Sequence, residues 1–151
     1  MPVSVGQHAP EFTLPDSDKK PRSLSEFKGR KTILAFFAGA FTGVCTKEMC
    51  AFRDSMSKLS GMNAQGVAIS VDAPLSNKAF AVQHNLQFPL LSDYTRSVAK
   101  QYGGVHNDFS GLIGYTAAKR AVFVVDKDGV VRYTWVSENP GVEPPYDEVT
   151  A

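Results

Sequence analysis

Apolar residues along the chain fall into short runs that predict strands buried on both faces. Residues 32–37 are almost all apolar, and residues 67–71 form a second such run. Runs of this length without polar alternation are typical of strands inside a parallel sheet. Residues 88–93 predict a further short strand. We therefore expect a sheet whose central strands have both faces covered.

The segments between these runs show helical spacing. After residue 41, apolar side chains recur every three or four positions and form one stripe of a helix: Cys45, Met49, Phe52, Met56 and Leu59. Gly61 is suited to end this helix. Residues 75–84 predict a second helix with Pro74 at its start, and residues 96–102 a brief third one. Strands that alternate with helices favour right-handed crossovers and a parallel sheet core.

The two ends of the chain carry hairpin signals. Residues 121–125 and 130–135 are rich in β-branched and aromatic side chains and flank an Asp-Lys-Asp-Gly turn, which predicts an antiparallel hairpin. Alternation at residues 11–14 predicts short strands, an N-terminal hairpin extension. Residues 103–118 are rich in glycine, and we expect an irregular surface loop there. Together these elements predict a single α/β domain over residues 1–151, with a central mixed sheet flanked by helices.

Composition and charge narrow the classes of function. The chain has 151 residues, with 16 Lys plus Arg against 15 Asp plus Glu and a net charge of +1. This balance gives no reason to expect a nucleic acid or an anionic membrane as a partner. No apolar run approaches the length of a membrane span, and residues 1–6 have no features of a signal peptide. We expect a soluble, cytoplasmic protein.

The two cysteines, Cys45 and Cys50, are too few for a disulfide-stapled scaffold. In a reducing cytosol, a close pair of cysteines is more often catalytic or metal-binding than structural. The three histidines, His8, His84 and His106, have no ligand spacing, and two cysteines alone do not complete a tetrahedral zinc site. We therefore expect no metal ion and favour redox or nucleophilic chemistry.

Cys45 stands where the first buried strand turns into the long helix. In open α/β folds, ligands bind at the carboxyl edge of the sheet, where such turns lie. Thr42 is suited to be the N-cap, which puts Cys45 in the first helical turn. Unpaired backbone N–H groups and the positive end of the helix dipole lower the pKa of a thiol at that place. This position predicts a reactive cysteine, although a thiol that serves only as a small buried side chain is the alternative.

The spacing between the two cysteines sets a condition on any bond between them. In an intact helix, residues five apart have Cα atoms about 8 to 9 Å apart. A disulfide requires Cα atoms within about 7 Å. Cys45 and Cys50 can therefore form a disulfide only after this helical turn unwinds, so a redox cycle here is coupled to local unfolding.

Residues 36–48, Phe-Phe-Ala-Gly-Ala-Phe-Thr-Gly-Val-Cys-Thr-Lys-Glu, resemble the active-site signature of the peroxiredoxins. That signature has a proline, three residues, Thr or Ser, two residues and the peroxidatic cysteine. Residues 5–12, 88–93 and 120–126 also have counterparts in the family. The resemblance implies a thioredoxin-like fold and a cofactor-free thiol peroxidase that reduces hydrogen peroxide and organic hydroperoxides. It also implies a thioredoxin-like or other thiol as reductant, and it makes a homodimer plausible.

The resemblance also assigns roles to individual residues. Cys45 matches the peroxidatic cysteine, and Thr42 matches the hydroxyl that orients peroxide and thiolate. Arg120 matches the arginine that lowers the thiol pKa and holds the peroxide. Glu48 matches an acidic position that helps to position an arginine. Cys50 matches the resolving cysteine of the subgroup called bacterioferritin comigratory protein or PrxQ.

Several alternatives remain open at this point. Residues 68–71 and 104–107 look equally like the one-cysteine alkyl hydroperoxide reductase E group, in which Cys50 would be a bystander and an external thiol would resolve the sulfenic acid. Ala38 occupies the position of the family's proline and leaves the backbone freer. A redox-dependent binding or holdase module with weakened peroxidase activity is therefore a third possibility. A general disulfide reductase is disfavoured because the chain has no Cys-x-x-Cys motif.

Overall fold

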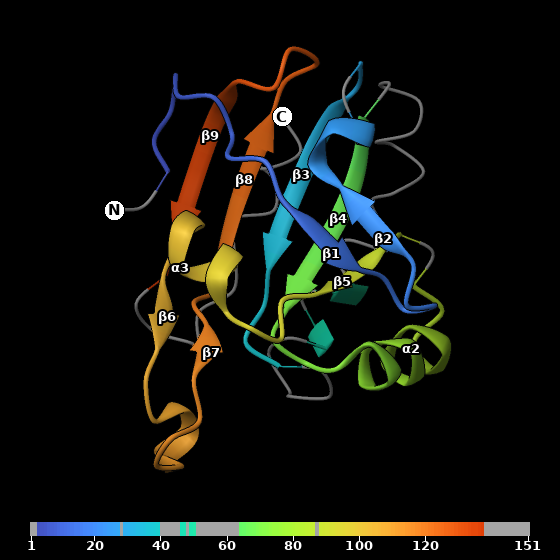
Figure 1. Ribbon diagram of the computed structural model, residues 1–151, viewed down its shortest axis with the longest axis vertical. Helices are drawn as coiled ribbons and strands as arrows, with labels where there is room; N and C mark the ends of the chain where they lie inside the picture. Colours follow the sequence, from blue (N-terminus) through green and yellow to red (C-terminus); the bar gives the residue numbers. More distant parts are fainter. Residues whose placement is uncertain are drawn as a thin grey trace.

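Within the residues that the computed structural model describes (3–27, 29–39, 46–47, 49–50, 64–86 and 88–137), five strands form a mixed sheet in the order β5-β4-β3-β8-β9 (Figure 1). The strands are β3 (Lys31–Phe36), β4 (Ala64–Ser70), β5 (Leu90–Ser92), β8 (Ala121–Val125) and β9 (Val131–Val136). Each lies on an apolar run that predicts a strand. β4 begins before the predicted residue 67, because Gln65 pairs with Thr32 despite its polar side chain.

β3 is the central strand and has a different kind of neighbour on each side. Leu34 lies opposite Val67 in the parallel ladder with β4 and opposite Phe123 in the antiparallel ladder with β8. β4 continues in parallel to β5, and β8 continues antiparallel to β9. The predicted mixed sheet and C-terminal hairpin are confirmed. Both edges of β3 are occupied, which agrees with its unbroken apolar sequence.

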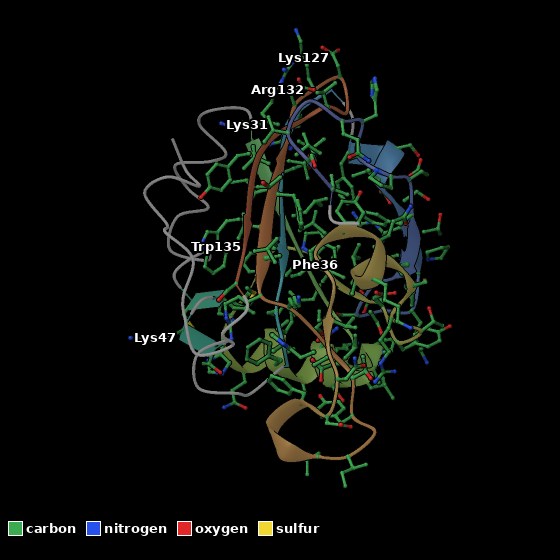
Figure 2. All side chains as sticks on the ribbon, turned by 90° about the vertical axis from the view of Figure 1, so that its left-hand side faces the viewer. Lys31, Phe36, Lys47, Lys127, Arg132 and Trp135 are labelled. Carbon is green, nitrogen blue, oxygen red and sulfur yellow. The ribbon has the colours of Figure 1, made fainter. Side chains whose placement is uncertain are left out.

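Alternate side chains of the strands form two cores, one on each face of the sheet. The first-face core joins the sheet to the N-terminal hairpin and to α3 through buried side chains that include Leu34, Phe36, Phe123, Phe12 and Tyr102. The second-face core lies against α2 and includes Ile33, Phe37, Met49, Phe80 and Val122. Figure 2 shows Phe36 and Trp135 on opposite sides of the sheet, and Trp135 packs partly buried against the second-face core.

The described helices α2 and α3 lie where sequence periodicity predicts them. α2 spans Pro74–Gln83, and its first helical residue is a proline, which lacks the N–H that would have no partner there. α3 spans Ser97–Tyr102. The N–H groups of Val98 and Ala99 in its first turn donate to the buried carboxylate of Asp93, at 3.3 and 2.6 Å. Burial raises the pKa of Asp93, although these two bonds oppose that shift.

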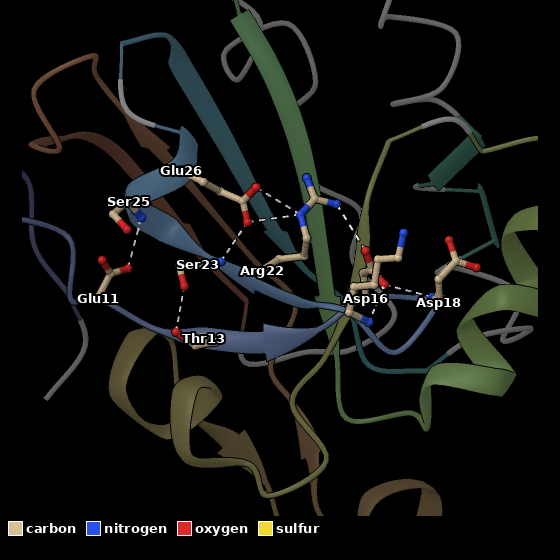
Figure 3. Close-up of polar contacts among 9 residues, drawn as sticks. Glu11, Thr13, Asp16, Asp18, Arg22, Ser23, Ser25 and Glu26 are labelled. Carbon is tan, nitrogen blue, oxygen red and sulfur yellow. Dashed lines mark hydrogen bonds and ion pairs between the residues drawn. The ribbon is translucent and has the colours of Figure 1, made fainter.

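The predicted N-terminal hairpin is present and lies across the first face of the sheet (Figure 1). It consists of β1 (Thr13–Pro15) and β2 (Pro21–Ser23), followed by the short helix η1 (Leu24–Phe27). The turn is held by Asp16, whose carboxylate accepts bonds from the N–H groups of Asp18 and Lys20 and from Arg22 (Figure 3). These bonds replace ladder bonds that a tight turn cannot make.

The expectation of an irregular loop over residues 103–118 is wrong. This segment projects from the sheet as a narrow hairpin of β6 (Val105–His106) and β7 (Ala117–Ala118), with the short helix η2 (Phe109–Gly111) near its tip (Figure 1). The ladder has two residue pairs, too few to produce an alternating pattern in the sequence. Ala117 and Ala118 are buried, and this burial holds the base of the hairpin against the rest of the fold.

Candidate active site

The carboxyl end of β3 leads directly into the segment that carries most of the predicted site residues. Phe37 extends the parallel pairing beyond β3, since its N–H donates to the carbonyl of Ile69 at 3.0 Å. Phe37 and Ala38 are 0% and 1% exposed, so the chain leaves the sheet in a buried position. Three predicted site residues follow and lie outside the described residues: Thr42, Cys45 and Glu48.

Arg120 reaches this same edge of the sheet through the antiparallel ladder. Phe36 ends β3 and lies opposite Ala121, which begins β8. One step further, Arg120 lies beside the continuation of β3. The N–H of Ser137 donates to the Arg120 carbonyl at 2.9 Å, so backbone pairing with the β9 side continues to this residue. The structure therefore brings Arg120 to the point where the chain leaves β3 for the predicted catalytic segment.

The Arg120 side chain is 1% exposed, the largest among the fully buried side chains of the described chain. A guanidinium stays protonated in proteins, so this edge of the sheet holds a positive charge away from water. Such a charge is costly unless anionic or polar groups face it. A positive charge of this kind lowers the pKa of a nearby thiol, and the N–H donors of the guanidinium stabilise an oxyanion.

The described part of the predicted long helix agrees with its expected orientation. Thr46, Lys47, Met49 and Cys50 are helical. Met49 has no exposed surface and belongs to the second-face core, whereas Lys47 is exposed. The predicted apolar stripe is thus confirmed at Met49. Residues four apart share a helix face, so the predicted position of Cys45 is on the face that Met49 buries.

Cys50 is partly buried, and its thiol has a histidine as neighbour. The distance between Cys50 Sγ and His84 Nδ1 is 3.9 Å. His84 directly follows α2 as its C-cap residue. Sequence analysis missed this histidine, because the two residues lie 34 positions apart and no local pattern connects them. The contact depends on how α2 packs beside the segment around Cys50, which is a property of the tertiary fold.

Ala38 fills the position of the proline in the peroxiredoxin signature. It is 1% exposed and packs in the second-face core together with Phe37 and Met49. It does not fix φ as proline does, so the backbone that enters the catalytic segment is less restricted than in the signature.

Two carboxylates outside this region, Glu11 and Asp126, hold backbone N–H groups of the fold. A cleft at the amino end of β3 is lined by His8, Glu11 and Asp126, among others. Glu11 already accepts bonds from backbone N–H groups, one of them that of Ser25 (Figure 3), and Asp126 does so within the β8–β9 turn.

In the part of the chain that the structure describes, no three His, Cys, Asp or Glu side chains are grouped to hold a metal ion. None of the described helices is long and apolar enough to cross a membrane.

The strand order, the paired cores and the crossover after β3 define a thioredoxin-like fold. The crystal structure of peroxidoxin BcpB from Mycobacterium tuberculosis superposes with a TM-score of 0.85 at 33% sequence identity, covering 98% of this chain and 94% of that one. The sequence model of the AhpC/TSA family matches residues 5–134. The chain belongs to the AhpC/TSA family, which confirms the resemblance noted from the sequence.

Curated relatives refine this assignment. Peroxiredoxin Q, chloroplastic, from Populus jackii is 44% identical over 130 residues, which are 86% of this chain and 59% of that protein. Putative peroxiredoxin bcp from Coxiella burnetii is 38% identical over 135 residues, 89% of each protein. The chain thus spans about three fifths of the length of the plant relatives and nearly all of the bacterial one. Both are named for the PrxQ or bcp subgroup, the one that the Cys45 and Cys50 spacing resembles.

Proposed function

We propose that the protein is a thiol-dependent peroxidase that reduces hydrogen peroxide and organic hydroperoxides, with Cys45 as the peroxidatic cysteine. The observation that carries this proposal is the buried Arg120 at the carboxyl end of β3. Arg120 is 1% exposed, and a guanidinium held away from water interacts more strongly with an anionic group beside it than one in solvent does. Its place beside the strand that leads to Cys45 supports a role in stabilising the thiolate and the peroxide.

In the first step, the Cys45 thiolate attacks one oxygen of the peroxide. A sulfur–oxygen bond forms, the oxygen–oxygen bond breaks, and the leaving alkoxide or hydroxide takes up a proton and departs as alcohol or water. Sulfur is oxidised by two electrons to the sulfenic acid, and the peroxide is reduced. Arg120 and the hydroxyl of Thr42 are the groups proposed to stabilise the negative charge as it moves onto the leaving oxygen. Glu48 is proposed to help position an arginine.

In the second step, the sulfur of Cys50 attacks the Cys45 sulfenic acid. A disulfide forms, the sulfur–oxygen bond breaks, and hydroxide leaves as water with the proton of the Cys50 thiol. A thioredoxin-like dithiol then supplies two electrons and restores both thiols. The helical state at Cys50 supports the condition that the helix must open for this step.

We further propose that the protein acts in the cytoplasm and as a homodimer, with the whole chain forming one domain. The cytoplasmic location and the single domain rest on the composition and the element pattern of the sequence. The homodimer rests on the family resemblance. Sedimentation of the reduced protein at two concentrations tests the dimer, and a single sedimenting species with the mass of one chain contradicts it.

Mass spectrometry after one equivalent of hydrogen peroxide tests the proposed chemistry. The parent protein is expected to lose two hydrogen atoms, whereas Cys50→Ser is expected to gain one oxygen atom. Cys45→Ser is the matched control and is expected to show neither change. Persistence of the oxygen adduct in the parent indicates resolution by an external thiol, and a Cys45→Ser protein that consumes peroxide as fast as the parent excludes Cys45 as the peroxidatic residue.

A further inference from the structure

His84 holds the Cys50 thiol in the folded protein. Sγ of Cys50 and Nδ1 of His84 lie 3.9 Å apart, within the range of a hydrogen bond to sulfur. Either the thiol donates to the ring nitrogen, or a protonated ring donates to the thiolate. In both cases the contact requires Cys50 to be in its helical position.

The imidazole is fixed from the α2 side. The backbone N–H of His84 donates to the carbonyl of Phe80 at 3.1 Å, and the imidazole ring lies edge-on to the Phe80 ring with centroids 5.1 Å apart. Phe80 itself has no exposed surface and packs against Phe37, with ring centroids 6.0 Å apart. His84 is therefore an oriented partner, held through Phe80 by the second-face core.

This contact and a disulfide to Cys45 exclude each other. In an intact helix, the Cα atoms of two residues five positions apart lie about 8 to 9 Å from each other, and a disulfide requires less than about 7 Å. Cys50 must leave its helical position, and with it His84, before it can reach Cys45. An interaction that exists in only one redox state shifts the equilibrium between dithiol and disulfide toward that state.

We infer that His84 is a positioning residue that stabilises Cys50 in the reduced, folded protein and so makes the Cys45–Cys50 disulfide easier to reduce. The inference rests on the proposed function, in which Cys50 resolves the sulfenic acid. His84 gains and loses no electrons. It releases Cys50 when the disulfide forms and recaptures it when an incoming dithiol has supplied two electrons and broken the S–S bond.

The test is the redox equilibrium of the two cysteines in dithiothreitol buffers, measured by mass. His84→Phe keeps the aromatic packing against Phe80 but removes Nδ1. A hydrogen bond of ordinary net strength corresponds to a roughly three- to tenfold change in an equilibrium constant. We expect the equilibrium to move toward the disulfide by that factor, which lowers the reduction potential by about 15 to 30 mV.

A second variant separates this role from packing. His84→Asn loses the ring but retains a polar atom near the position of Nδ1, so it is expected to lie closer to the parent than His84→Phe does. A packing role predicts the opposite order. His8→Phe is the matched control, because His8 is exposed and bridges to Val130 near the amino end of β9, at the far edge of the sheet. It is expected to leave the equilibrium unchanged.

The outcomes distinguish this inference from the function on which it rests. A disulfide that forms in the parent and in His84→Phe with equal reduction potentials overturns the role of His84 alone. A larger shift in His84→Asn than in His84→Phe also overturns it. A sulfenic acid that persists in the parent overturns resolution by Cys50, and the role of His84 with it.

Discussion

Ala121 faces Phe36 across the ladder between β8 and β3, and this pairing fixes where the adjacent Arg120 emerges. The two ends of the ladder are not equivalent. At this end, the backbone places the buried guanidinium of Arg120 beside the point where the chain leaves β3. The other end carries the Asp126–Gly129 turn, in which Lys127 and Asp128 are exposed.

Arg120→Met replaces the guanidinium with a neutral side chain of similar length. We expect the rate of peroxide reduction to fall about ten- to a hundredfold, since a hydrogen bond to a charged group contributes about 1.5 to 3 kcal/mol. Stopped-flow measurement of the Cys45 reaction with hydrogen peroxide checks this. Arg132→Met is the control, because Arg132 is exposed and makes a surface ion pair with Asp126 at 2.8 Å. A rate in Arg120→Met equal to that of the control contradicts the role of Arg120.

Met49 holds the segment with Cys50 to the second-face core, and it has no exposed surface. Met49→Ala is expected to lower the free energy of unfolding by about 2 to 5 kcal/mol, the usual range for truncating a buried methionine. Chemical denaturation of the reduced protein measures it. Lys47→Ala changes an exposed neighbour on the same helical segment and is expected to stay within about 0.5 kcal/mol of the parent. Equal losses in the two variants argue against the buried position of Met49.

Asp126 makes part of the stability dependent on pH. The N–H of Val130 lowers the pKa of Asp126 most, and bonds from Arg132 and Asp128 add to this, against a smaller opposing effect of burial. A carboxyl with a lower pKa in the folded state stabilises the fold above the unfolded value of 3.8, and this stabilisation is lost as the pH falls through the folded pKa.

Asp126→Asn is therefore expected to flatten the fall in unfolding free energy between about pH 5 and pH 2. Urea denaturation at several pH values measures that slope. Asp128→Asn removes the same charge from the same turn but leaves the bonds to Asp126 in place, and it is expected to retain the slope of the parent. An unchanged slope in Asp126→Asn would show that its native bonds contribute nothing to acid stability.

Ala38→Pro restores the residue of the peroxiredoxin signature at a buried position. Where the native backbone accepts proline, the stiffer unfolded chain raises stability by about 0.4 to 1 kcal/mol. We expect that gain, together with slower alkylation of Cys45 by iodoacetamide as the entry to the site becomes more restricted. Ala35→Pro is the contrasting variant, because Ala35 lies within β3 and pairs with both Ala68 and Val122. A similar loss of stability in both variants would show that residue 38 cannot adopt the backbone of proline.

The spacing of apolar residues was sufficient to predict the larger strands and helices, because the physical causes of these elements are local. The two-sided burial of β3 produces an unbroken apolar run, and the loss of an N–H at Pro74 fits the first turn of α2. The role expected of Arg120 came from family resemblance, while its burial and its place beside the end of β3 required the ladder register. Thr42, Cys45 and Glu48 remain predictions.

The features that sequence did not predict depend on contacts between distant segments. The β6–β7 hairpin has two residue pairs, and it is stabilised by burial of Ala117 and Ala118 rather than by an alternating pattern. His84 contacts Cys50 only because α2 packs beside the helical segment that carries this cysteine. No propensity or motif in either segment encodes such a neighbour, since Cys50 lies in the connection between β3 and β4 and His84 in the one between β4 and β5.

The position of β3 between β4 and β8 has a consequence for biosynthesis. A chain that emerges from the ribosome presents the cysteines soon after β3, but Arg120 and β8 emerge only after β4 to β7 have been synthesised. Until then, one edge of an apolar strand lacks its partner, the situation that promotes aggregation and chaperone binding. The nascent protein thus exposes thiols before it has the buried cation proposed to tune them, so the proposed selective reaction with peroxide requires β8 to have paired with β3.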